Sequence, residues 1–343
     1  MGSVKELKAY RQPTPARSGI GQFVFSDRYS VFDWGEMPDR IEGKGASLCV
    51  MAAHFFEILG REGIPNHFLG LGDGYDIKLL TGLMEPSTRM MVKLFRVVRP
   101  GTAEGSYDYS AYRSLSSNFL IPLEVIYRNV LPAGSSVFRR LEEGTLSAAD
   151  LGLSGPPEPG QVLERPFIEV STKLESTDRY ISWDEARSIS CLTIDETDRI
   201  RELTLRINEI ISAEAARAGL VNEDGKIEFA FDESGDIVVV DVIGTPDECR
   251  FTLDGFHVSK ELARTWYRDT PWHIEIEAVK KAHPVEWKSF VSAAPDPLPP
   301  ERLRGLSLLY KACCNALTGK SWFRAPDLGE VAALLGGRPA VRT

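Results

Sequence analysis

Two carboxylates on either side of a turn are the first residues of this sequence whose spacing suggests chemistry. Glu228 lies in the run Lys226–Phe229, and Asp241 interrupts the apolar residues that follow Ile237. If a hairpin turn connects the two segments, the carboxylates can lie side by side on paired strands. Such neighbours repel each other unless a cation lies between them, and Mg²⁺ with nucleotide phosphates suits that place. Two solvated carboxylates on an exposed strand face are the alternative, and periodicity alone favours it.

Two arginines stand where they could bind an anion. Arg250 ends the segment that follows the second hairpin strand, where a turn can present its guanidinium as a fork for phosphate or carboxylate. Arg128, together with Glu124, breaks an apolar strand. The small turn after it contains Ser135 and leaves backbone N–H groups and hydroxyls free for a phosphate. Each of these patterns is also typical of an ordinary protein surface.

A dense polar cluster precedes the first expected helix. Its candidate ligand-facing residues are Ser26, Asp27, Arg28 and Asp33. Lys44, flanked by glycines, opens the helix, and a lysine near a helix N-terminus would suit an anionic ligand. A capped helix with a solvated lysine explains the same pattern. Lys173 stands alone in a polar strand and predicts little by itself.

The remaining motifs and the composition exclude several classes of protein. The five histidines show no metal-ligand spacing, and the sequence contains neither a glycine-rich dinucleotide or P-loop motif nor a nucleophile elbow. A net charge of −9 argues against general nucleic-acid binding. No apolar run approaches the roughly 18–20 residues that cross a bilayer, and no secretory signal is visible. With five unpaired-looking cysteines, we expect a cytoplasmic protein without nucleic-acid or membrane partners.

The hydrophobic pattern predicts strands mainly early in the chain and helices mainly late. Runs of apolar and β-branched residues predict strands at 21–25, 90–98, 118–127, 226–231 and 237–243. Helical spacing and caps predict helices at 45–60, from 182, from 193, at 259–268 and at 303–317. Pro122 marks an irregularity in its strand, and 144–166 is expected to be a surface excursion. This order of elements favours the α+β class.

Taken in order, these segments resemble the SAICAR synthase family, the phosphoribosylaminoimidazole-succinocarboxamide synthases of purine biosynthesis. The most specific of them are PLEVIYRN at 122–129 and TPDECR at 245–250. The other matching segments are SDRYSVFD with GKG at 26–45, PNHF at 65–68, AGS at 133–135, STK at 171–173, GKIEF at 225–229 and VVDVIG at 239–244. They cover about 26–251, and the sequence of the segment around SDRYSVFD looks most like archaeal members.

The resemblance implies an α+β fold of two lobes, related to ATP-grasp and kinase-like architectures, with antiparallel sheets, helices and ATP in the cleft between the lobes. It implies an N-terminal β-rich lobe at 1–122 that covers the nucleotide, and a larger lobe at 123–343 with the substrate site. The implied activity is that of a ligase that forms a C–N bond. It would condense CAIR, an imidazole ribonucleotide bearing a carboxylate, with L-aspartate while ATP becomes ADP and phosphate.

The resemblance also implies roles for individual residues. Glu228 and Asp241 match the carboxylates that hold Mg²⁺ and ATP, and Glu124 marks the strand where adenine docks. The positions that contact CAIR are matched by Arg128, Ser135 and Arg250. The lysines that line the phosphate and substrate cleft are matched by Lys44, Lys173 and Lys226. Lys173, Lys226 and Asp241 are the expected catalytic residues, and the polar cluster before the first helix belongs to the substrate side.

The sequence departs from the family at the N-terminal strand. Members open with a Gly-Lys-x-Lys/Arg strand that covers the ATP phosphates, whereas the match here keeps only Lys5 and has Leu7 at the second basic position. On an extended strand, Lys5 shares its face with Arg11, and Lys8 points the other way. We therefore expect Arg11 to compensate in nucleotide binding, unless a bulge resets the alternation. A second departure is that the family's common Asp-Glu pair reads Asp241-Val242.

Other functions stay open on the sequence alone. One is a related ATP-dependent carboxylate–amine ligase or small-molecule kinase on the same fold. The other is a catalytically inactive nucleotide-binding relative, for which the altered N-terminal strand is the only support. The sequence is compatible with a homo-oligomer and does not give the oligomeric state.

Overall fold

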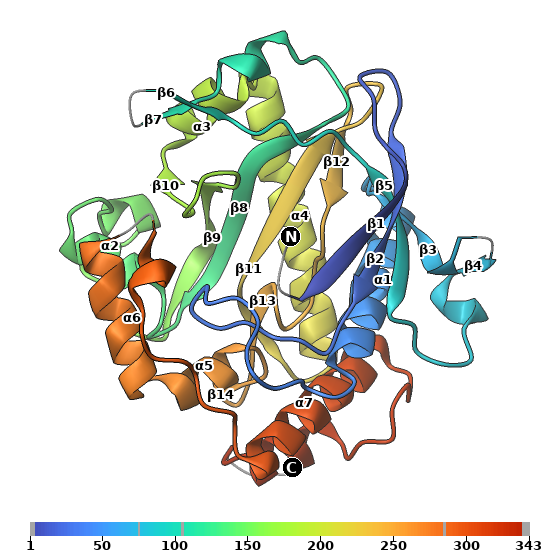
Figure 1. The fold of residues 1–343 in the computed structure, drawn as a ribbon, viewed down its shortest axis with the longest axis vertical. Helices are drawn as coiled ribbons and strands as arrows, with labels where there is room; N and C mark the ends of the chain where they lie inside the picture. Colours follow the sequence, from blue (N-terminus) through green and yellow to red (C-terminus); the bar gives the residue numbers. More distant parts are fainter. Residues whose placement is uncertain (1–3, 75, 104–105, 284–285, 338–343) are drawn as a thin grey trace.

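The computed structural model describes residues 4–74, 76–103, 106–283 and 286–337, and builds two main antiparallel sheets (Figure 1). The first sheet has five strands in the order β1-β2-β5-β3-β4. Their bounds are Lys5–Arg11 (β1), Gly19–Phe25 (β2), Phe68–Asp73 (β3), Asp76–Lys78 (β4) and Arg89–Leu94 (β5). A separate two-stranded sheet pairs β6 (Gly101–Ala103) with β7 (Ser106–Asp108).

The second sheet has seven strands and forms the centre of the molecule. Its order is β10-β9-β8-β11-β13-β14, and β12 also pairs with β11. The bounds are Phe119–Leu131 (β8), Gln161–Thr172 (β9), Tyr180–Ile181 (β10), Val221–Phe231 (β11), Ile237–Val240 (β12), Cys249–Leu253 (β13) and Phe256–His257 (β14). All pairings in both sheets are antiparallel.

Short backbone bridges join the two sheets. The N–H of His67, before β3, donates to the carbonyl of Val239 on β12 at 3.0 Å, and Arg96, after β5, exchanges hydrogen bonds with the start of β8. One cluster of buried apolar side chains extends across both sheets, from Phe25 on β2 to Phe229 on β11. The expected lobe boundary at 122/123 therefore falls inside a strand, β8, and that division stays a prediction.

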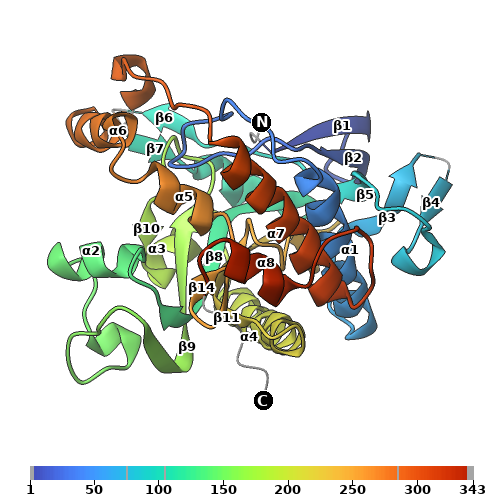
Figure 2. The same cartoon turned by 90° about the horizontal axis from the view of Figure 1, so that it is seen from below.

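Helices cover the outer faces of the sheets. The helices are α1 (Lys44–Arg61), α2 (Ser136–Glu142), α3 (Trp183–Ser190), α4 (Ile194–Arg217), α5 (Glu261–Tyr267), α6 (Pro271–Ala282), α7 (Pro300–Thr318) and α8 (Leu328–Leu334). A capping box between Thr193 and Glu196 opens α4, which packs its apolar side against β8 and β11 (Figure 1). Seen from below, α7 lies beside α1 (Figure 2). Within the described ranges, every helix is too short or too polar to span a membrane.

The expected elements are confirmed with shifts at their ends, and the α+β class is confirmed. β5 ends at Leu94 rather than Val98, because the chain turns there to join β8, which itself continues to Leu131. The irregularity at Pro122 is present, since β8 has three residues where β11 has one. The expected excursion 144–166 is shorter, because its last six residues already belong to β9. The sequence pattern missed α2, α6 and α8.

Candidate active site

One face of the central sheet carries charged side chains at alternate positions. Directly opposed residues of antiparallel strands point to the same face of the sheet, and so does every second residue along one strand. β8 contributes Glu124 and Arg128 to this face, and β11 contributes Asp224, Lys226 and Glu228. α4 packs on the opposite face, so the charged face is left for ligands.

Two carboxylates lie directly opposite each other on this face. Glu124 on β8 pairs directly with Glu228 on β11, and both are buried, at 7% and 5% exposure. Lys173 contacts both carboxylates, at 2.8 Å to Glu124, and Lys226 contacts Glu124 at 2.8 Å and Glu228 at 3.8 Å. Two ammonium groups thus neutralise two carboxylates. We call these four residues the lysine–carboxylate cluster.

The cluster shifts the pKa values of its two carboxylates in opposite directions. Burial alone would raise the pKa of Glu124, but the ammonium groups of Lys226 and Lys173 lower it to about 2. Burial raises the pKa of Glu228 to about 7, and the neighbouring Asp241 carboxylate adds to that rise. Burial and the Asp241 charge thus disfavour the ionised form of Glu228, which a further cation at this place would favour.

Asp241 joins this cluster from the end of β12, but in a different register from the one expected. Glu228 lies opposite Val240, so an extended chain would point Asp241 to the other face of the sheet. The chain leaves the strand here, and Asp241 adopts a left-handed backbone with φ of 66°, which re-aims its side chain. Nε2 of the buried His67 lies 3.1 Å from the Asp241 carbonyl oxygen and fixes this turn.

Lys5 supplies the cation for Asp241 from the other sheet. Its ammonium group lies 2.8 Å from the Asp241 carboxylate. Burial raises the pKa of Asp241, but Lys5 and the lysines of the cluster outweigh it and hold that pKa well below its usual range. The candidate nucleotide side of the site is therefore assembled from β1 of the first sheet and β8, β9, β11 and β12 of the second.

The carboxylates fit one mode of magnesium binding. Across the parts of the chain that the structure describes, no three His, Cys, Asp or Glu side chains form a set that could hold a metal by themselves. Mg²⁺ commonly takes only one or two protein carboxylates and completes its shell with substrate phosphates and water. Glu228 and Asp241 suit that mode, because the two carboxylates lie close enough for the charge of Asp241 to raise the pKa of Glu228, a repulsion that a cation between them would relieve.

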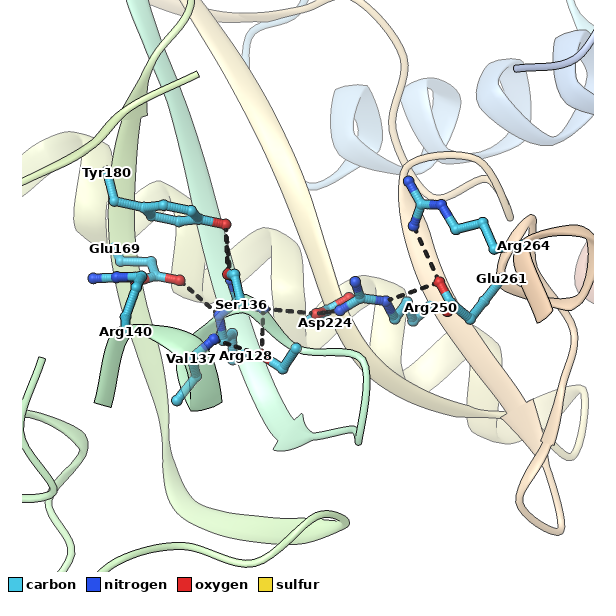
Figure 3. A network of polar contacts seen from close by, with 11 residues as sticks. Arg128, Ser136, Val137, Arg140, Glu169, Tyr180, Asp224, Arg250, Glu261 and Arg264 are labelled. Carbon is cyan, nitrogen blue, oxygen red and sulfur yellow. Dashed lines mark hydrogen bonds and ion pairs between the residues drawn. The ribbon is translucent and has the colours of Figure 1, made fainter. Parts of the chain in front are cut away.

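At the other end of the charged face, cations and carboxylates alternate in a chain (Figure 3). Arg128 is buried and donates to Glu169 at 2.6 Å, to Asp224 at 2.9 Å and to the hydroxyls of Ser135, Ser136 and Tyr180 at 3.2–3.3 Å. These bonds use all three nitrogens of the guanidinium group. Ser135 also caps α2, where it accepts from the N–H of Val137.

Arg250 continues this chain on β13. It pairs with Asp224, the residue directly opposite, and its Nε lies 4.0 Å from Glu261 on α5. Glu261 in turn accepts from Arg264 at 3.1 Å and from Arg268 at 3.0 Å. Unlike Arg128, which is 3% exposed, the Arg250 side chain is 20% exposed and can reach a ligand.

A cavity of about 280 Å³ connects the two ends of the charged face. Its walls include Glu124 and Lys226 at one end and Arg250 and Arg264 at the other. Lys260 also lines it, and burial lowers the pKa of this lysine. Anionic and cationic groups therefore face one open cavity of a size that suits part of a nucleotide.

Three of the expected substrate-binding residues hold the chain rather than face the cavity. The Asp27 carboxylate accepts from the N–H groups of Gly43 and Gly45 at the start of α1. Ser26 donates to the Val4 carbonyl at 2.8 Å and accepts from Arg28. These contacts order the loop before α1.

The two other expected substrate-side residues, Asp33 and Lys44, lie in different places. Asp33 has a left-handed backbone, lines the cavity and receives Lys280 of α6 at 3.2 Å. Lys44 is fully buried and lies 2.6 Å from the Asp247 carboxylate, which also accepts from Tyr310 of α7. Of these two, only Asp33 reaches the cavity.

The register expected for Arg11 is wrong. Ala9 pairs with Gly21 but Arg11 pairs with Ile20, so Tyr10 forms a bulge that turns Arg11 to the face opposite Lys5. Its guanidinium donates to the Ser18 carbonyl at 3.2 Å. Lys8 lies on that same face and stacks on Tyr10.

Sequence reasoning missed several charged residues of the site. They are Glu169, Asp178, Asp224, Asp247, Glu248, Lys260, Glu261 and Arg264. Asp224 had a readable signal, because Asp224-x-Lys226-x-Glu228 repeats every second residue in a buried strand. Glu169 lies on β9, and the others lie in turns or on α5, where no periodicity marks them.

Comparisons with known proteins agree on one family. The family model of SAICAR synthetase matches residues 5–279. A protein of Archaeoglobus fulgidus named putative phosphoribosylaminoimidazole-succinocarboxamide synthase is 48% identical over 335 residues, which are 98% of each chain.

Two solved structures share the fold. SAICAR synthase from Saccharomyces cerevisiae complexed with SAICAR aligns with a TM-score of 0.63 and 22% identity over 94% of each chain. A SAICAR synthetase in complex with ADP aligns with a TM-score of 0.57 and 24% identity over 87% of this chain and 99% of that one.

The buried pair of Lys44 and Asp247 generates a stability prediction. Replacing Lys44 with Met leaves a buried carboxylate without its cation, which typically costs about 3–5 kcal/mol. We expect K44M to lose that much free energy of unfolding in a urea titration. K78M, which breaks the exposed pair with Asp76, is the control and should change by about 0–1 kcal/mol. A stable K44M protein with weakened substrate binding would instead support the ligand contact implied by the family.

The lysine–carboxylate cluster generates a pH prediction. The pKa of Glu124 in the fold lies below its ordinary value of 4.5, so its ionised form stabilises the protein above that pH, and this stability disappears as the pH falls toward about 2. We expect E124Q to be less stable than the parent by roughly 3 kcal/mol at pH 6, and by half of that or less at pH 3. E164Q, at an exposed residue of β9, is the control for urea unfolding at both pH values. A pH-independent difference would contradict the assigned pKa.

Proposed function

Because the chain belongs to the SAICAR synthetase family, a family of ligases that form a C–N bond in purine biosynthesis, we propose that it joins CAIR to L-aspartate at the expense of ATP. The observation that carries this proposal is the charged face, on which Glu124 and Lys226 of the lysine–carboxylate cluster line the same cavity as Arg128, Asp224 and Arg250 of the arginine–carboxylate chain. The solved relatives, one complexed with ADP and one with SAICAR, support nucleotide and product binding at this fold.

The proposed chemistry needs activation of a carboxylate. A carboxylate acylates an amine poorly, because oxide would have to leave. Transfer of the γ-phosphoryl group of ATP to a CAIR carboxylate oxygen gives an acyl phosphate and ADP. The aspartate nitrogen, as the free amine, then attacks the acyl carbon, phosphate leaves with the bonding electron pair, and the nitrogen loses one proton and keeps the other as the amide N–H. No protein nucleophile is needed, which agrees with the absence of a nucleophile elbow in the sequence.

The lysine–carboxylate cluster would serve the phosphoryl transfer. Glu228 and Asp241 would hold Mg²⁺, which neutralises charge on the phosphate oxygens when bound. Lys173 and Lys226 lie beside these carboxylates and would stabilise the developing charge on the transferred group. Glu124 lies on β8, the strand proposed for adenine docking. Its carboxylate would keep both ammonium groups in place and charged.

The arginine–carboxylate chain would bind CAIR. Arg250 lines the cavity and keeps part of its side chain accessible, so it is the residue we assign to direct contact with a CAIR anion. Arg128 and Ser135 are engaged with neighbours, and we assign them the role of holding Asp224 and α2 in position. Asp33, at the cavity mouth, remains on the substrate side.

The experiment that tests this function is a coupled assay for ADP and SAICAR with CAIR, L-aspartate and MgATP, each omitted in turn. The proposal requires product only when all three are present. ATP turnover that is independent of CAIR or aspartate would instead indicate a kinase or a ligase with another acceptor, and no turnover at all would indicate an inactive relative.

Asp241→Asn is expected to remove most turnover and leave the fold intact. Changing a residue that only orients a metal ligand costs roughly 10–100-fold, so loss of a ligand should lower kcat by at least about 100-fold. D236N, at an exposed turn residue of the same hairpin, is the control. Both kcat and Tm are measured, and a kcat close to that of the parent would remove Asp241 from the metal site.

Arg250→Lys is expected to weaken CAIR use selectively. An ammonium group cannot reproduce the bidentate geometry of guanidinium, so the KM for CAIR should rise about tenfold while the KM for ATP changes much less. R268K is the matched control, because Arg268 pairs with the same Glu261 but does not line the cavity. Equal changes in both KM values would assign Arg250 a structural role.

A further inference from the structure

Lys5 differs from the other lysines of the site in how it is held. It lies on β1, an edge strand of the first sheet whose next six residues are exposed. Its ammonium group has one ion-pair partner among the described residues, Asp241, at 2.8 Å, and both side chains are 23% exposed. This contact ties the edge strand to the end of β12 in the other sheet.

The lysines of the second sheet are bound more firmly. Lys173 contacts two carboxylates and Lys226 contacts three, and all of these belong to strands of the central sheet or to the turn that follows β12. Removing either would leave the two buried carboxylates, Glu124 and Glu228, with a single ammonium group between them. Lys5 can leave at lower cost, because its partner is partly exposed and its own strand forms a sheet edge.

We propose that Lys5 and a divalent metal ion compete for the Asp241 carboxylate, so that metal loading transfers Lys5 from Asp241 to the phosphates of the nucleotide. The inference rests on the proposed function, because it takes Asp241 as the metal ligand. An ammonium group and a divalent ion on one carboxylate repel each other, and the central lysines already raise the local positive charge. The loosely held cation is the one that moves.

The arrangement of β1 explains why Lys5, and no other cation among the described residues of this strand, would move to the phosphates. Because of the bulge at Tyr10, Lys8 and Arg11 point to the opposite face, and Leu7 occupies the other site-facing position next to Lys5. Among the described residues of β1, Lys5 is therefore the cation that can follow the phosphates. Its transfer would draw the edge strand over the nucleotide only when the metal is present, which makes Lys5 a positioning residue that couples metal to strand closure.

The test measures Mn²⁺ binding by the full chain, because its readout does not depend on turnover. Free Mn²⁺ is followed by electron paramagnetic resonance, first without nucleotide and then with ADP. Without nucleotide, K5M should bind Mn²⁺ about three- to tenfold more tightly than the parent, since the competing ammonium group is gone. With ADP the order should reverse, because K5M lacks the cation that follows the phosphates.

Matched variants make the outcome specific. K8M removes a lysine of the same strand that faces away from Asp241 and should match the parent in both titrations. K5R keeps a cation and should resemble the parent without nucleotide. K5Q repeats the measurement with a polar side chain in case K5M folds poorly, and Tm with and without Mn²⁺ is recorded for each. D241N should bind Mn²⁺ more weakly than the parent in both titrations.

The possible results separate this inference from the proposed function. Unchanged or weaker Mn²⁺ binding by K5M and K5Q without nucleotide would overturn the competition. Unchanged affinity of K5M in the presence of ADP would overturn the transfer to the phosphates. Failure of the parent protein to form SAICAR in the omission assay would overturn the function, whatever the Mn²⁺ titrations give.

Discussion

The site depends on the direct opposition of Glu124 and Glu228 on buried, hydrogen-bonded strands. This pairing would destabilise the sheet if no cation compensated the two charges. Like charges at that spacing destabilise a sheet, and burial increases the cost. Lys173, directly after β9, and Lys226, on β11, make the arrangement stable, and to do so both must project over the same face. The geometry of the central sheet and the position of these two lysines are therefore set by one constraint.

The second sheet alone does not complete the site. Asp241 reaches the cluster only because the chain leaves β12 in a left-handed conformation, and His67, which precedes β3 of the first sheet, holds the carbonyl of that residue. Lys5 then contacts Asp241 from β1. Both contacts belong to the short bridges that join the sheets, so a change in the relative position of the sheets would act directly on the candidate metal ligand.

The sequence allowed the fold class and most elements to be predicted, because apolar periodicity and caps such as that of Thr193 are local. It also indicated Glu124 and Arg128, since charges that break an apolar strand are visible without a structure. The strand registers could not be predicted from the sequence. The offset of Asp241 from Glu228 depends on where β12 ends, and the orientation of Arg11 depends on a bulge at Tyr10. A shift of one residue reverses the face of a side chain, and nothing in the local pattern sets it.

The charge balance of the cavity changes how substrate binding should be understood. The protein carries a net charge of −9, and nearly every cation on the charged face already has a carboxylate partner, so anionic substrates do not meet bare positive charge. Binding must instead exchange carboxylate contacts for substrate contacts, and the free energy is the difference between the two. Partly exposed partners such as Arg250 and Lys5 can make that exchange, whereas the saturated Arg128 cannot. Specificity would then come from which ion pairs a ligand can replace, and less from the total charge it meets.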